Sequence, residues 1–546
     1  MNAPFSPEQL AGILGNQEFI AELAKSIGTN LSIAKADTVS TSTGLVWYDL
    51  RPVVQMLYPF KELIPLVSRL PRVPGDGGTA VHWKRVTGVN VGNISVGVSE
   101  GNRGARIAIT EQDQLATYKT LGLEGSATFQ ARWASKNLSP EALGVAVQAT
   151  LRSTMIGEEQ TVILGNASTP LGVTPTPVLS ASGTTGNWGG TVTVYVICVA
   201  LSGLGWSGYT PYNSTSGLGG VPGQVSKVNV GGSTDTFGGG SSQPSAEASI
   251  SGVTTAQLVT ASVTAVVGAV SYAWFVGTAT GAETLAGLTA SNKVVFSKNP
   301  GTSAQPITSL KVGAGYQDNS TNSLIFDGIL SQIYGSVTGN APGTAMNTNP
   351  TLPTVSTGVL QISANSGAIV LTMNQGNTGL TINGQNITEF DAVCQAAWDQ
   401  YKVPFDRILM SSTDIINGMG TFFNSSNTTD YLFLAQADAV AGRIVAGRRI
   451  TTYMNKVTNR PLDVDVHPNI PPGTIIFWSD RIPYELAGIA NVLELHTRQD
   501  YYQMEWPIVQ MRYEFGCYVD EVLIGYFMPA FATIVNVNSP AGTVTY

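Results

Sequence analysis

Several groups of residues in this 546-residue chain have types and spacings that could support chemistry. Gly203, Gly205 and Gly208 have the G-x-G-x-x-G spacing of a dinucleotide-binding turn, and they follow a predicted strand. However, the continuation YTPYNSTSGLGG cannot begin a helix, and no acidic residue lies about 20 positions further on. We therefore interpret this motif as a loop between strands.

Paired carboxylates and histidines are the next candidates. Glu158 with Glu159, and Asp463 with Asp465, could act as general acid and base. We interpret the first pair as a polar helix face and the second pair as the edge of a hairpin. The histidines are single and lack metal-ligand spacing with cysteines or carboxylates: His82, His467 and His496. No GxxxxGK[ST] phosphate-binding motif is present, so the sequence predicts no enzyme, no catalytic residue, no metal and no cofactor.

The basic residues do not form the patch that nucleic-acid binding requires. The chain has 28 lysines and arginines against 36 acidic residues, and its net charge is −8. A protein that binds nucleic acid tightly needs clustered cations to displace counterions. The densest basic cluster is Arg443, Arg448 and Arg449. We expect this cluster to contact acidic residues of a neighbouring subunit rather than DNA.

Cysteine usage and hydropathy bear on the compartment in which the chain is made. The three cysteines are odd in number and far apart in sequence, which argues against a disulfide framework and for a reducing compartment. The N-terminal residues lack the basic-then-apolar pattern of a signal peptide. No apolar run approaches the ~18 residues of a membrane span. The sequence therefore predicts synthesis in a cytoplasm and no membrane contact.

The longest predicted element is a helix from Ser139 to Gly165. Ser139 can cap the helix, Pro140 suits the first helical position, and Glu141 suits the positive end of the helix dipole. Gly165 lies where a left-handed stop is expected. Apolar residues recur every fourth position between these ends, at Leu143, Val147, Leu151 and Met155. The pattern predicts a helix of about 25 residues, roughly 37 Å long.

The segment before this helix, Val73 to Asn137, predicts a long two-stranded arm. Alternating stretches such as Ala80–Trp83 and Thr117–Leu121 favour strands, and glycines between them mark bends. An isolated hairpin is marginally stable in water, and this one has too few apolar side chains to bury itself. We therefore expect the arm to lie across another copy of the same chain.

Residues 170–306 differ in composition from the rest of the chain. They are rich in glycine, serine, threonine and valine, and poor in charge. Short alternating strands recur, for example at Thr191–Val196, Val270–Val276 and Lys293–Phe296, with turn residues between them. The pattern predicts a small β-sandwich of the immunoglobulin or fibronectin type III kind, inserted into a host domain that resumes afterwards.

The remaining segments contain shorter predicted elements. Residues 6–27 have the apolar spacing of an amphipathic docking helix, and a further helix is expected at Ile387–Tyr401. A helix is also expected within SLIFDGILSQIYG, which begins at Ser323. Residues 448–480 have hairpin character, and Leu493 to Val537 is predicted to be mostly β.

The order of these elements resembles that of the major capsid proteins of tailed bacteriophages. The resemblance is carried by RVPGDGGTAVHWKR in the arm, EEQTVILGN at the end of the long helix, TEFDAVCQAAWDQYKVPFDRILMS, and the closing strands ending in MPAFATIVNV. It implies an α+β, Hong Kong 97-type capsid fold with an inserted β-sandwich. The implied segments are an N-terminal arm (1–72), an extended β-hairpin loop (73–138), a spine helix (139–169), the insertion (170–306), a peripheral domain (307–385 and 491–546) and an axial domain (386–490).

The resemblance also implies a function. It implies a structural protein that self-assembles through hexamers and pentamers into an icosahedral shell enclosing double-stranded DNA, synthesised and assembled in a host bacterial cytoplasm. The expected partners are other copies of the chain, portal, scaffold or decoration proteins, and packaged DNA held weakly and without sequence specificity. The candidates for assembly contacts are Trp83, Lys84, Arg85, Lys119, Arg443, Arg448 and Arg449.

Two further points stay open in the sequence. Some members of the family link the extended loop to a neighbour by a Lys–Asn isopeptide bond assisted by Glu, but no motif assigns these three roles here. The alternative function is a phage tail, fibre or adhesin subunit whose β-sandwich binds host-surface glycans. The absence of the repeats that fibres usually contain argues against it.

Overall fold

The computed structural model describes residues 64–75, 77–89, 96–104, 109–134, 142–229, 232–301, 303–335, 346–347, 351–374, 379–383, 386–416, 452–486, 489–508, 510–538 and 546. These residues are mostly β, with few helices. They form two compact units. Unit 1 takes in the described parts of Met1–Val81, Ala116–Val162 and Glu494–Leu523, and unit 2 takes in those of His82–Leu115, Ile163–Leu493 and Ile524–Tyr546. The predicted helix within residues 6–27 lies outside the described residues.

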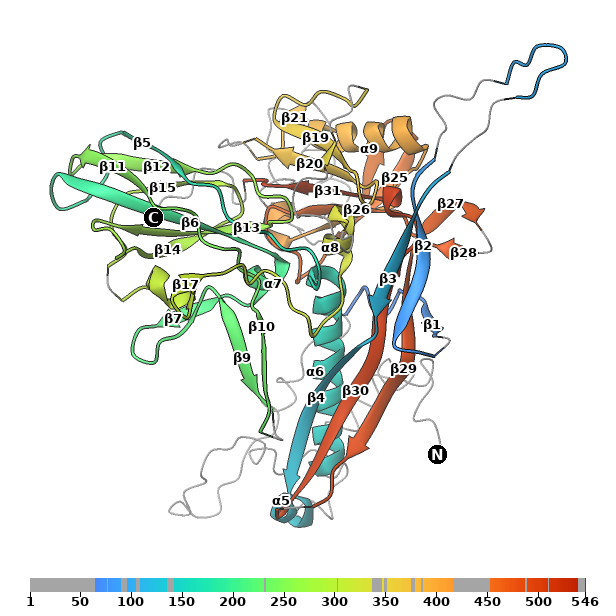
Figure 1. Ribbon diagram of the computed structural model, residues 1–546, viewed down its shortest axis with the longest axis horizontal. Helices are drawn as coiled ribbons and strands as arrows, with labels where there is room; N and C mark the ends of the chain where they lie inside the picture. Colours follow the sequence, from blue (N-terminus) through green and yellow to red (C-terminus); the bar gives the residue numbers. More distant parts are fainter. Residues whose placement is uncertain are drawn as a thin grey trace, which may run out of the picture. The chain divides into compact units, whose positions relative to one another are not determined.

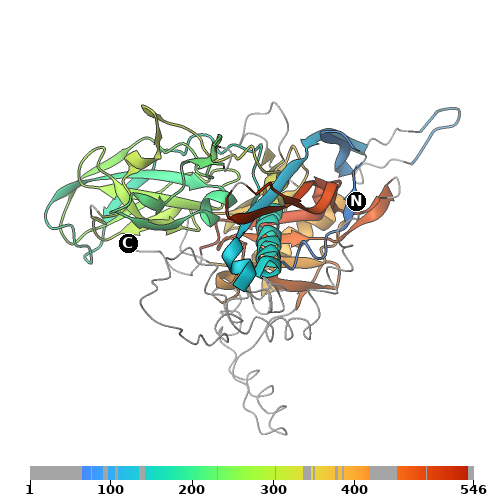
Figure 2. The ribbon, with the colours of Figure 1, turned by 90° about the horizontal axis from the view of Figure 1, so that it is seen from below.

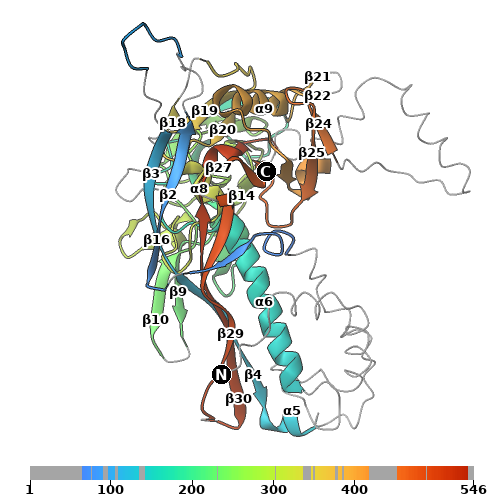
Figure 3. The ribbon, with the colours of Figure 1, turned by 90° about the vertical axis from the view of Figure 1, so that its right-hand side faces the viewer.

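Unit 1 consists of a four-stranded sheet and a long helix. The strand order is β1 (Arg72–Pro74), β29 (Leu493–Glu505), β30 (Arg512–Gly525) and β4 (Lys119–Thr128). β1 runs parallel to β29, and β4 runs antiparallel to β30 over ten residue pairs. Helix α6 (Ala142–Leu164) lies alongside β4 and β30 (Figure 1; Figure 3). A short helix, α5 (Phe129–Ala134), follows β4.

Helix α6 confirms the predicted long helix in its body but not at its end. It has 23 residues, which corresponds to roughly 35 Å. The predicted cap at Ser139 and Pro140 lies outside the described residues. Gly165 follows the helix but is not among the glycines with positive φ, so the predicted left-handed stop is wrong. Instead, the carbonyl of Gly165 accepts hydrogen bonds from the amide of Gly328 and the hydroxyl of Ser331.

The predicted arm divides between two pairings. Only β2 (Ala80–Val89) and β3 (Ile109–Thr117) pair with each other as a two-stranded ribbon. Strands β1 and β4, which we assigned to the same hairpin, join the four-stranded sheet of unit 1 instead. The reason is the long complementary strand β30, which gives β4 a partner along its whole length.

Unit 2 contains an eight-stranded mixed sheet. Its order is β18 (Met346–Asn347), β19 (Gly358–Ser363), β20 (Ile369–Met373), β31 (Phe531–Val535), β26 (Ile475–Trp478), β23 (Arg407–Met410), β25 (Arg460–Val466) and β24 (Thr452–Asn455). Helix α9 (Thr388–Tyr401) confirms the predicted second helix. Its Phe390 packs edge-to-face on Phe477, with ring centroids 5.2 Å apart.

The eight-stranded sheet crosses the predicted domain boundaries. Strand β31 lies in its interior, parallel to β20 of the segment 307–385 and antiparallel to β26 of the segment 386–490. All five residues of β31 are buried, so this position satisfies both faces of a mostly apolar strand, and the hydroxyl of its Thr533 donates to the carbonyl of Ile475. The predicted helix near Ser323 is also shorter than expected, because only α8 (Ile329–Tyr334) is helical.

A second part of unit 2 contains two sheets that share one apolar core, and we call it the two-sheet segment (residues 178–296). One sheet has the order β11 (Ala248–Val253), β6 (Val192–Leu201), β13 (Ser271–Gly277) and β14 (Thr284–Thr289). The other has the order β15 (Lys293–Phe296), β12 (Leu258–Ser262) and β5 (Val178–Ser182). Figure 2 gives a second view of these layers. The shared core includes Val196, Trp274, Val259, Ala261 and Phe296.

The two-sheet segment is packed on both faces of its larger sheet. The opposite face of β6 and β13 forms a second core that includes Ile307 and Leu310, beyond the predicted boundary at residue 306. The chain enters and leaves this region side by side. The amide of Leu171 donates to the hydroxyl of Ser320 at 2.8 Å, and the amide of Gly172 donates to Asp318 at 2.7 Å.

The remaining elements of unit 2 are short. They are the strand pairs β7 (Thr210–Asn213) with β8 (Leu218–Gly220), β9 (Gln224–Val228) with β10 (Thr234–Gly238), β16 (Lys311–Val312) with β17 (Gly315–Tyr316), β21 (Ile382–Asn383) with β22 (Asn386–Ile387), and β27 (Arg481–Leu486) with β28 (Ile489–Asn491). The described part of unit 2 also contains the short helices α7 (Gly203–Ser207) and α10 (Ser412–Asp414) and the 3₁₀ turns Ile307–Leu310 and Met528–Ala530. In the part of the chain described here, no helix has the length and apolarity to cross a membrane.

Close packing of α6 on its sheet depends on Gly125 in β4. A Cβ atom at this position would lie 2.5 Å from the hydroxyl of Thr150 in α6 and 2.6 Å from the ring of Phe515 in β30. We predict that Gly125→Ala lowers the free energy of unfolding by about 1–3 kcal/mol, because the helix and strand must move apart. Denaturant unfolding of the purified protein measures this change.

The matched control is Gly144→Ala, within α6 itself. No atom lies within 4 Å of a Cβ built at Gly144. Alanine is a better helix former than glycine by up to about 1 kcal/mol, so this variant should be no less stable than the wild type. Equal stability of the two variants would contradict the packing described for α6.

Candidate functional site

Arg72 lies at the centre of a buried ionic cluster in unit 1. Its guanidinium donates to Glu158 of α6, to Asp500 of β29 at 3.1 Å, and to Glu521 of β30 at 3.2 Å. It also donates to the hydroxyl of Tyr501 at 2.8 Å and covers the ring of the same residue. The side chains of Glu158 and Glu521 have no exposed area. One arginine therefore joins four elements that are far apart in sequence.

Burial governs the protonation of this cluster. It raises the pKa of Glu521 well above the ordinary value, and the neighbouring charge of Glu158 raises it further. Burial also raises the pKa of Glu158, against the opposing charge of Arg72. Burial lowers the pKa of Arg72, but the surrounding anions outweigh this effect and raise it overall. Arg72 therefore keeps its charge, and the two glutamates hold protons to a higher pH than exposed glutamates do.

Glu159 is buried beside this cluster but has different partners. Its carboxylate accepts hydrogen bonds from the backbone amides of Leu66, at 2.8 Å, and Val67, at 2.6 Å. It thereby fixes the apolar turn before β1 against α6. The predicted polar helix face at Glu158 and Glu159 is thus wrong, because both side chains are internal. No substrate can reach them, and their role is to hold segments together.

One member of the second carboxylate pair belongs to an ion network, in the expected hairpin. Asp465 in β25 accepts from Arg407 at 3.1 Å, and Arg407 also binds Asp480 at 3.0 Å. Asp463 lies in the same strand, which pairs antiparallel with β24. Asp465 therefore binds a cation of the chain itself.

The glycine motif has a packing role. Gly203–Ser207 forms the short helix α7 directly after β6, so the prediction of a plain loop is wrong. A Cβ at Gly205 would lie 2.5 Å from the carbonyl oxygen of Gly240, and one at Gly203 would lie 2.8 Å from Leu164. Gly203 and Gly205 are therefore required because neighbouring segments of the chain leave no room for a side chain at these positions.

The histidines lie apart from one another. His467 is buried, and its Nδ1 accepts from the amide of Asn469 at 3.1 Å. His496 lies 3.4 Å from Glu494, and His82 is exposed. Across the described ranges, no group of three histidine, cysteine or acidic residues is placed to hold a metal ion. The three cysteines are buried and unpaired.

The arm candidates divide into surface and internal residues. Lys84 is exposed and pairs with Glu111 across the β2–β3 ribbon at 3.3 Å. Arg85 is buried, and it donates to the carbonyl of Gly525 and to Gln332. Burial lowers the pKa of Arg85 to about 10. Because its hydrogen bonds are made inside the chain, Arg85 is not available for an intersubunit contact.

The remaining candidates for assembly contacts are two half-buried residues of the arm and the arginine cluster. Trp83 is half-buried and donates to the carbonyl of Gly525 at 3.1 Å. Lys119 is half-buried in β4. The cluster of Arg443, Arg448 and Arg449 lies outside the described residues.

An exposed apolar cluster, which we call the apolar tip, lies where α5 meets the ends of β29 and β30. The amide of Phe129 donates to the carbonyl of Met511, and the ring of Phe129 lies 6.1 Å from that of Trp133 and stacks on that of Tyr513 at 5.9 Å. The exposed fractions are 36% for Phe129, 58% for Trp133, 37% for Trp506, 60% for Ile508 and 67% for Met511. Such a concentration of large apolar side chains marks an interaction surface.

A second exposed apolar site lies between β2 and β3. In residues 96–104, Val96 is 85% exposed and Val98 is 49% exposed. Sequence analysis did not identify either site by residue. The apolar tip in particular combines segments that are separated by hundreds of positions, so no local pattern could reveal it.

Comparison with known proteins gave matches among solved structures only. No protein-family model and no curated protein matches this sequence. The capsid of the native GTA particle matches with 7% identity over 92% of this chain and 96% of that chain, at a TM-score of 0.36. The Cyanophage A-1(L) capsid matches with 10% identity over 96% of this chain and 99% of that chain, at a TM-score of 0.37.

A further match is an encapsulin complex. The holo-SrpI encapsulin complex from Synechococcus elongatus PCC 7942 matches with 9% identity over 94% of this chain and 95% of that chain, at a TM-score of 0.30. At such low TM-scores, none of these three matches by itself establishes a shared fold.

The buried glutamates make the stability of unit 1 dependent on pH. Unfolded glutamates have a pKa of about 4.3. Above that pH the folded chain, with its raised pKa values, holds more protons than the unfolded chain, so stability falls as pH rises through the folded values. We predict that Glu521→Gln, which stays uncharged, reduces this alkaline loss of stability. Denaturant unfolding at a series of pH values from neutral upward measures it.

The control is Glu124→Gln in β4. Glu124 lies at the surface and accepts from the hydroxyl of Tyr518 at 2.8 Å. This variant should keep the pH dependence of the wild type. If Glu521→Gln showed the same alkaline loss as Glu124→Gln, the assignment of raised pKa values to the Arg72 cluster would be wrong.

Proposed function

We propose that this protein is the major capsid protein of a tailed bacteriophage, and that it assembles through hexamers and pentamers into an icosahedral shell around double-stranded DNA. The order of elements in the sequence, which resembles that of the Hong Kong 97-type fold, supports the proposal. In this interpretation α6 is the spine helix and the β2–β3 ribbon belongs to the extended loop. Strands β23, β24, β25 and β26 of the eight-stranded sheet belong to the axial domain, and its strands β18, β19, β20 and β31 belong to the peripheral domain.

The observation that carries the proposal is the apolar tip. A soluble monomer rarely exposes a contiguous apolar patch of this kind. Its aromatic and methionine side chains are among the types enriched at protein interfaces. Phe129 and Tyr513 are already stacked, and Arg132 lies over the ring of Tyr513 at 4.6 Å. These side chains are thus ordered before a partner binds, which lowers the entropic cost of association.

Closed symmetry turns such modest contacts into a stable particle. Each subunit of a ring makes the same contact twice, once with each neighbour, and ring closure removes all free ends. The arm residues Val96 and Val98 would supply a second contact, over an adjacent subunit. A shell therefore uses the two exposed apolar sites at once.

The charge of the chain suits a container rather than a DNA-binding protein. With a net charge of −8, a subunit would repel the packaged DNA weakly. We infer that contact with DNA is weak and independent of sequence. The shell would assemble in the host cytoplasm and remain in the virion.

We propose that the two-sheet segment is an immunoglobulin-like domain inserted into the shell-forming chain. Its entry and exit lie side by side at Leu171 and Ser320, as an insertion requires. We place it on the outer surface, because a domain of this size would obstruct a packed interior. In the alternative function, a tail, fibre or adhesin subunit, this segment would be the part that binds host-surface glycans.

We predict that replacing Trp133 and Met511 together by serine abolishes particle formation while the subunit stays folded. The expected reason is the loss of the largest exposed apolar side chains from the apolar tip. Negative-stain microscopy and sedimentation of purified wild-type and variant protein measure assembly. Nuclease-protected DNA in wild-type particles would separate a genome container from a shell that encloses other cargo.

The matched control replaces Leu218 and Val228 by serine, since these are exposed at 70% and 71% in the two-sheet segment. This control should assemble as the wild type does. Shells formed equally by the tip variant, or tubes and slender fibres formed by the wild type, would contradict the proposed function.

A deletion tests the proposed role of the insertion. Joining Gly172 to Asp318 through a short glycine-serine linker removes residues 173–317, and the amide of Gly172 already lies 2.7 Å from the carboxylate of Asp318. We predict that the shortened subunit folds and still forms closed shells. A shortened subunit that unfolds cooperatively but no longer assembles would show that the insertion supplies assembly contacts.

A further inference from the structure

Unit 2 contains a cavity between the two-sheet segment and the eight-stranded sheet. It has a volume of about 250 Å³. One wall is the loop of residues 264–267 with Asn292, and the other is the face of β19, β20 and the end of β31, with Tyr334 from α8 at its side. Thr264 and Val359 on its rim are exposed, so the cavity opens to solvent.

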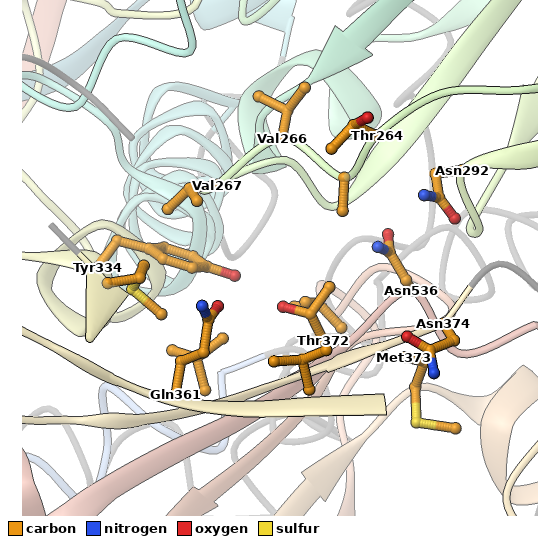
Figure 4. Close-up of a pocket in the computed structure, with 15 residues that line it drawn as sticks. Thr264, Val266, Val267, Asn292, Tyr334, Gln361, Thr372, Met373, Asn374 and Asn536 are labelled. Atoms are coloured by element: carbon orange, nitrogen blue, oxygen red, sulfur yellow. The ribbon is translucent and has the colours of Figure 1, made fainter. Parts of the chain in front are cut away.

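Three buried polar side chains that line this cavity have atoms without a hydrogen-bond partner. They are the Oδ1 of Asn536, the Oδ1 of Asn292 and the hydroxyl of Tyr334. The exposed fractions of the three residues are 4%, 2% and 6% in the same order. An unpaired buried polar atom destabilises the folded chain, so such atoms are rare unless a bound molecule satisfies them. Figure 4 shows the polar ends of Tyr334, Gln361 and Asn536 facing one space.

The backbone at Asn536 adds to this cost. Its φ is +62°, one of three positive values among the described residues other than glycine. Asparagine tolerates this conformation better than most residues, but glycine tolerates it best. Near it, the hydroxyl of Tyr272 accepts from the amide of Val266 at 3.0 Å and is also hydrogen-bonded to the side chain of Asn536. This contact orients the Asn536 amide and leaves its Oδ1 at the cavity without a partner.

The lining defines the chemistry of the occupant. No charged side chain lines the cavity, so it favours a neutral molecule over a phosphate, a nucleotide or an amino acid. The unpaired atoms include donors and acceptors, and hydroxyl groups can serve both. The walls between them are apolar, from Val266, Val370 and Val535.

The volume of the cavity and the strand pairing in its wall restrict further which molecule can bind. A water molecule takes about 30 Å³, so the cavity could hold several waters or one small organic molecule. Strands β20 and β31 have a paired neighbour on both sides, so their backbone groups are already paired. A peptide therefore cannot add a strand to β20 or β31.

We propose that this cavity binds a neutral, hydroxyl-bearing molecule of the size of one monosaccharide. Asn536 and Asn292 would accept hydrogen bonds from hydroxyl groups of this molecule, and Tyr334 would donate one. The site lies within a single chain and does not depend on the proposed shell function, so it can be tested whether or not particles form.

The test is titration of the full-length protein with D-glucose, D-galactose and N-acetyl-D-glucosamine, followed by saturation-transfer NMR. We expect saturable binding of at least one of the three. Asn536→Gly should weaken that binding by about tenfold or more, which corresponds to the loss of one or two hydrogen bonds. The same variant should unfold at a temperature close to that of the wild type, because glycine prefers this backbone conformation and thereby offsets the lost hydrogen bond to Tyr272.

The matched control is Asn459→Gly. Asn459 is also in the left-handed region, with a φ of +54°, but it is exposed and does not line the cavity. It should leave binding unchanged. If Asn536→Gly fails to fold, Tyr334→Phe, which removes a hydroxyl without a partner, takes its place. Absence of binding by all three sugars, or binding that survives the cavity substitutions, would overturn the proposal.

Discussion

The ionic cluster around Arg72 is the interaction on which unit 1 depends. Removing a guanidinium and two carboxylates from water costs free energy that only their mutual contacts offset. The cluster therefore forms only when β1, α6, β29 and β30 close around it. It specifies which distant segments meet, and Glu159 extends the same control to the turn at Leu66 and Val67. Helix α6 is thus fixed by buried charge as well as by its apolar stripe.

Unit 1 consequently has an unusual distribution of side chains. Charged groups lie in its interior, while large apolar groups such as Trp133 and Met511 lie exposed at the ends of its strands. Folding of the single chain therefore leaves some apolar surface of unit 1 in contact with water. A second copy that covers the apolar tip would supply the missing burial, and this is the physical reason for an assembling protein. Unit 2 differs, because its two-sheet segment encloses Trp274 and Phe296 completely.

Local patterns in the sequence predicted local structure well. The body of α6, helix α9 and strand β15 follow from apolar periodicity and turn residues, which act over a few positions. The interior position of β31 could not be predicted, because strand pairing depends on distant partners.

The candidate site was harder to predict for the same reason. The burial of Glu158 and Glu159 depends on Arg72 and on the amides of Leu66 and Val67, far away in sequence. The one available signal was a pair of glutamates shortly before the apolar run Val162–Leu164. The apolar tip gave no signal, because Phe129, Trp133 and Met511 become neighbours only through the pairing of β4 with β30.

The most direct test of this account is a cryo-microscopy reconstruction of the material that the wild-type chain forms on expression. The account predicts a closed shell in which Phe129, Trp133 and Met511 are buried against a neighbouring copy. A particle in which these side chains face solvent, or a stable monomer that forms no particle, would contradict it.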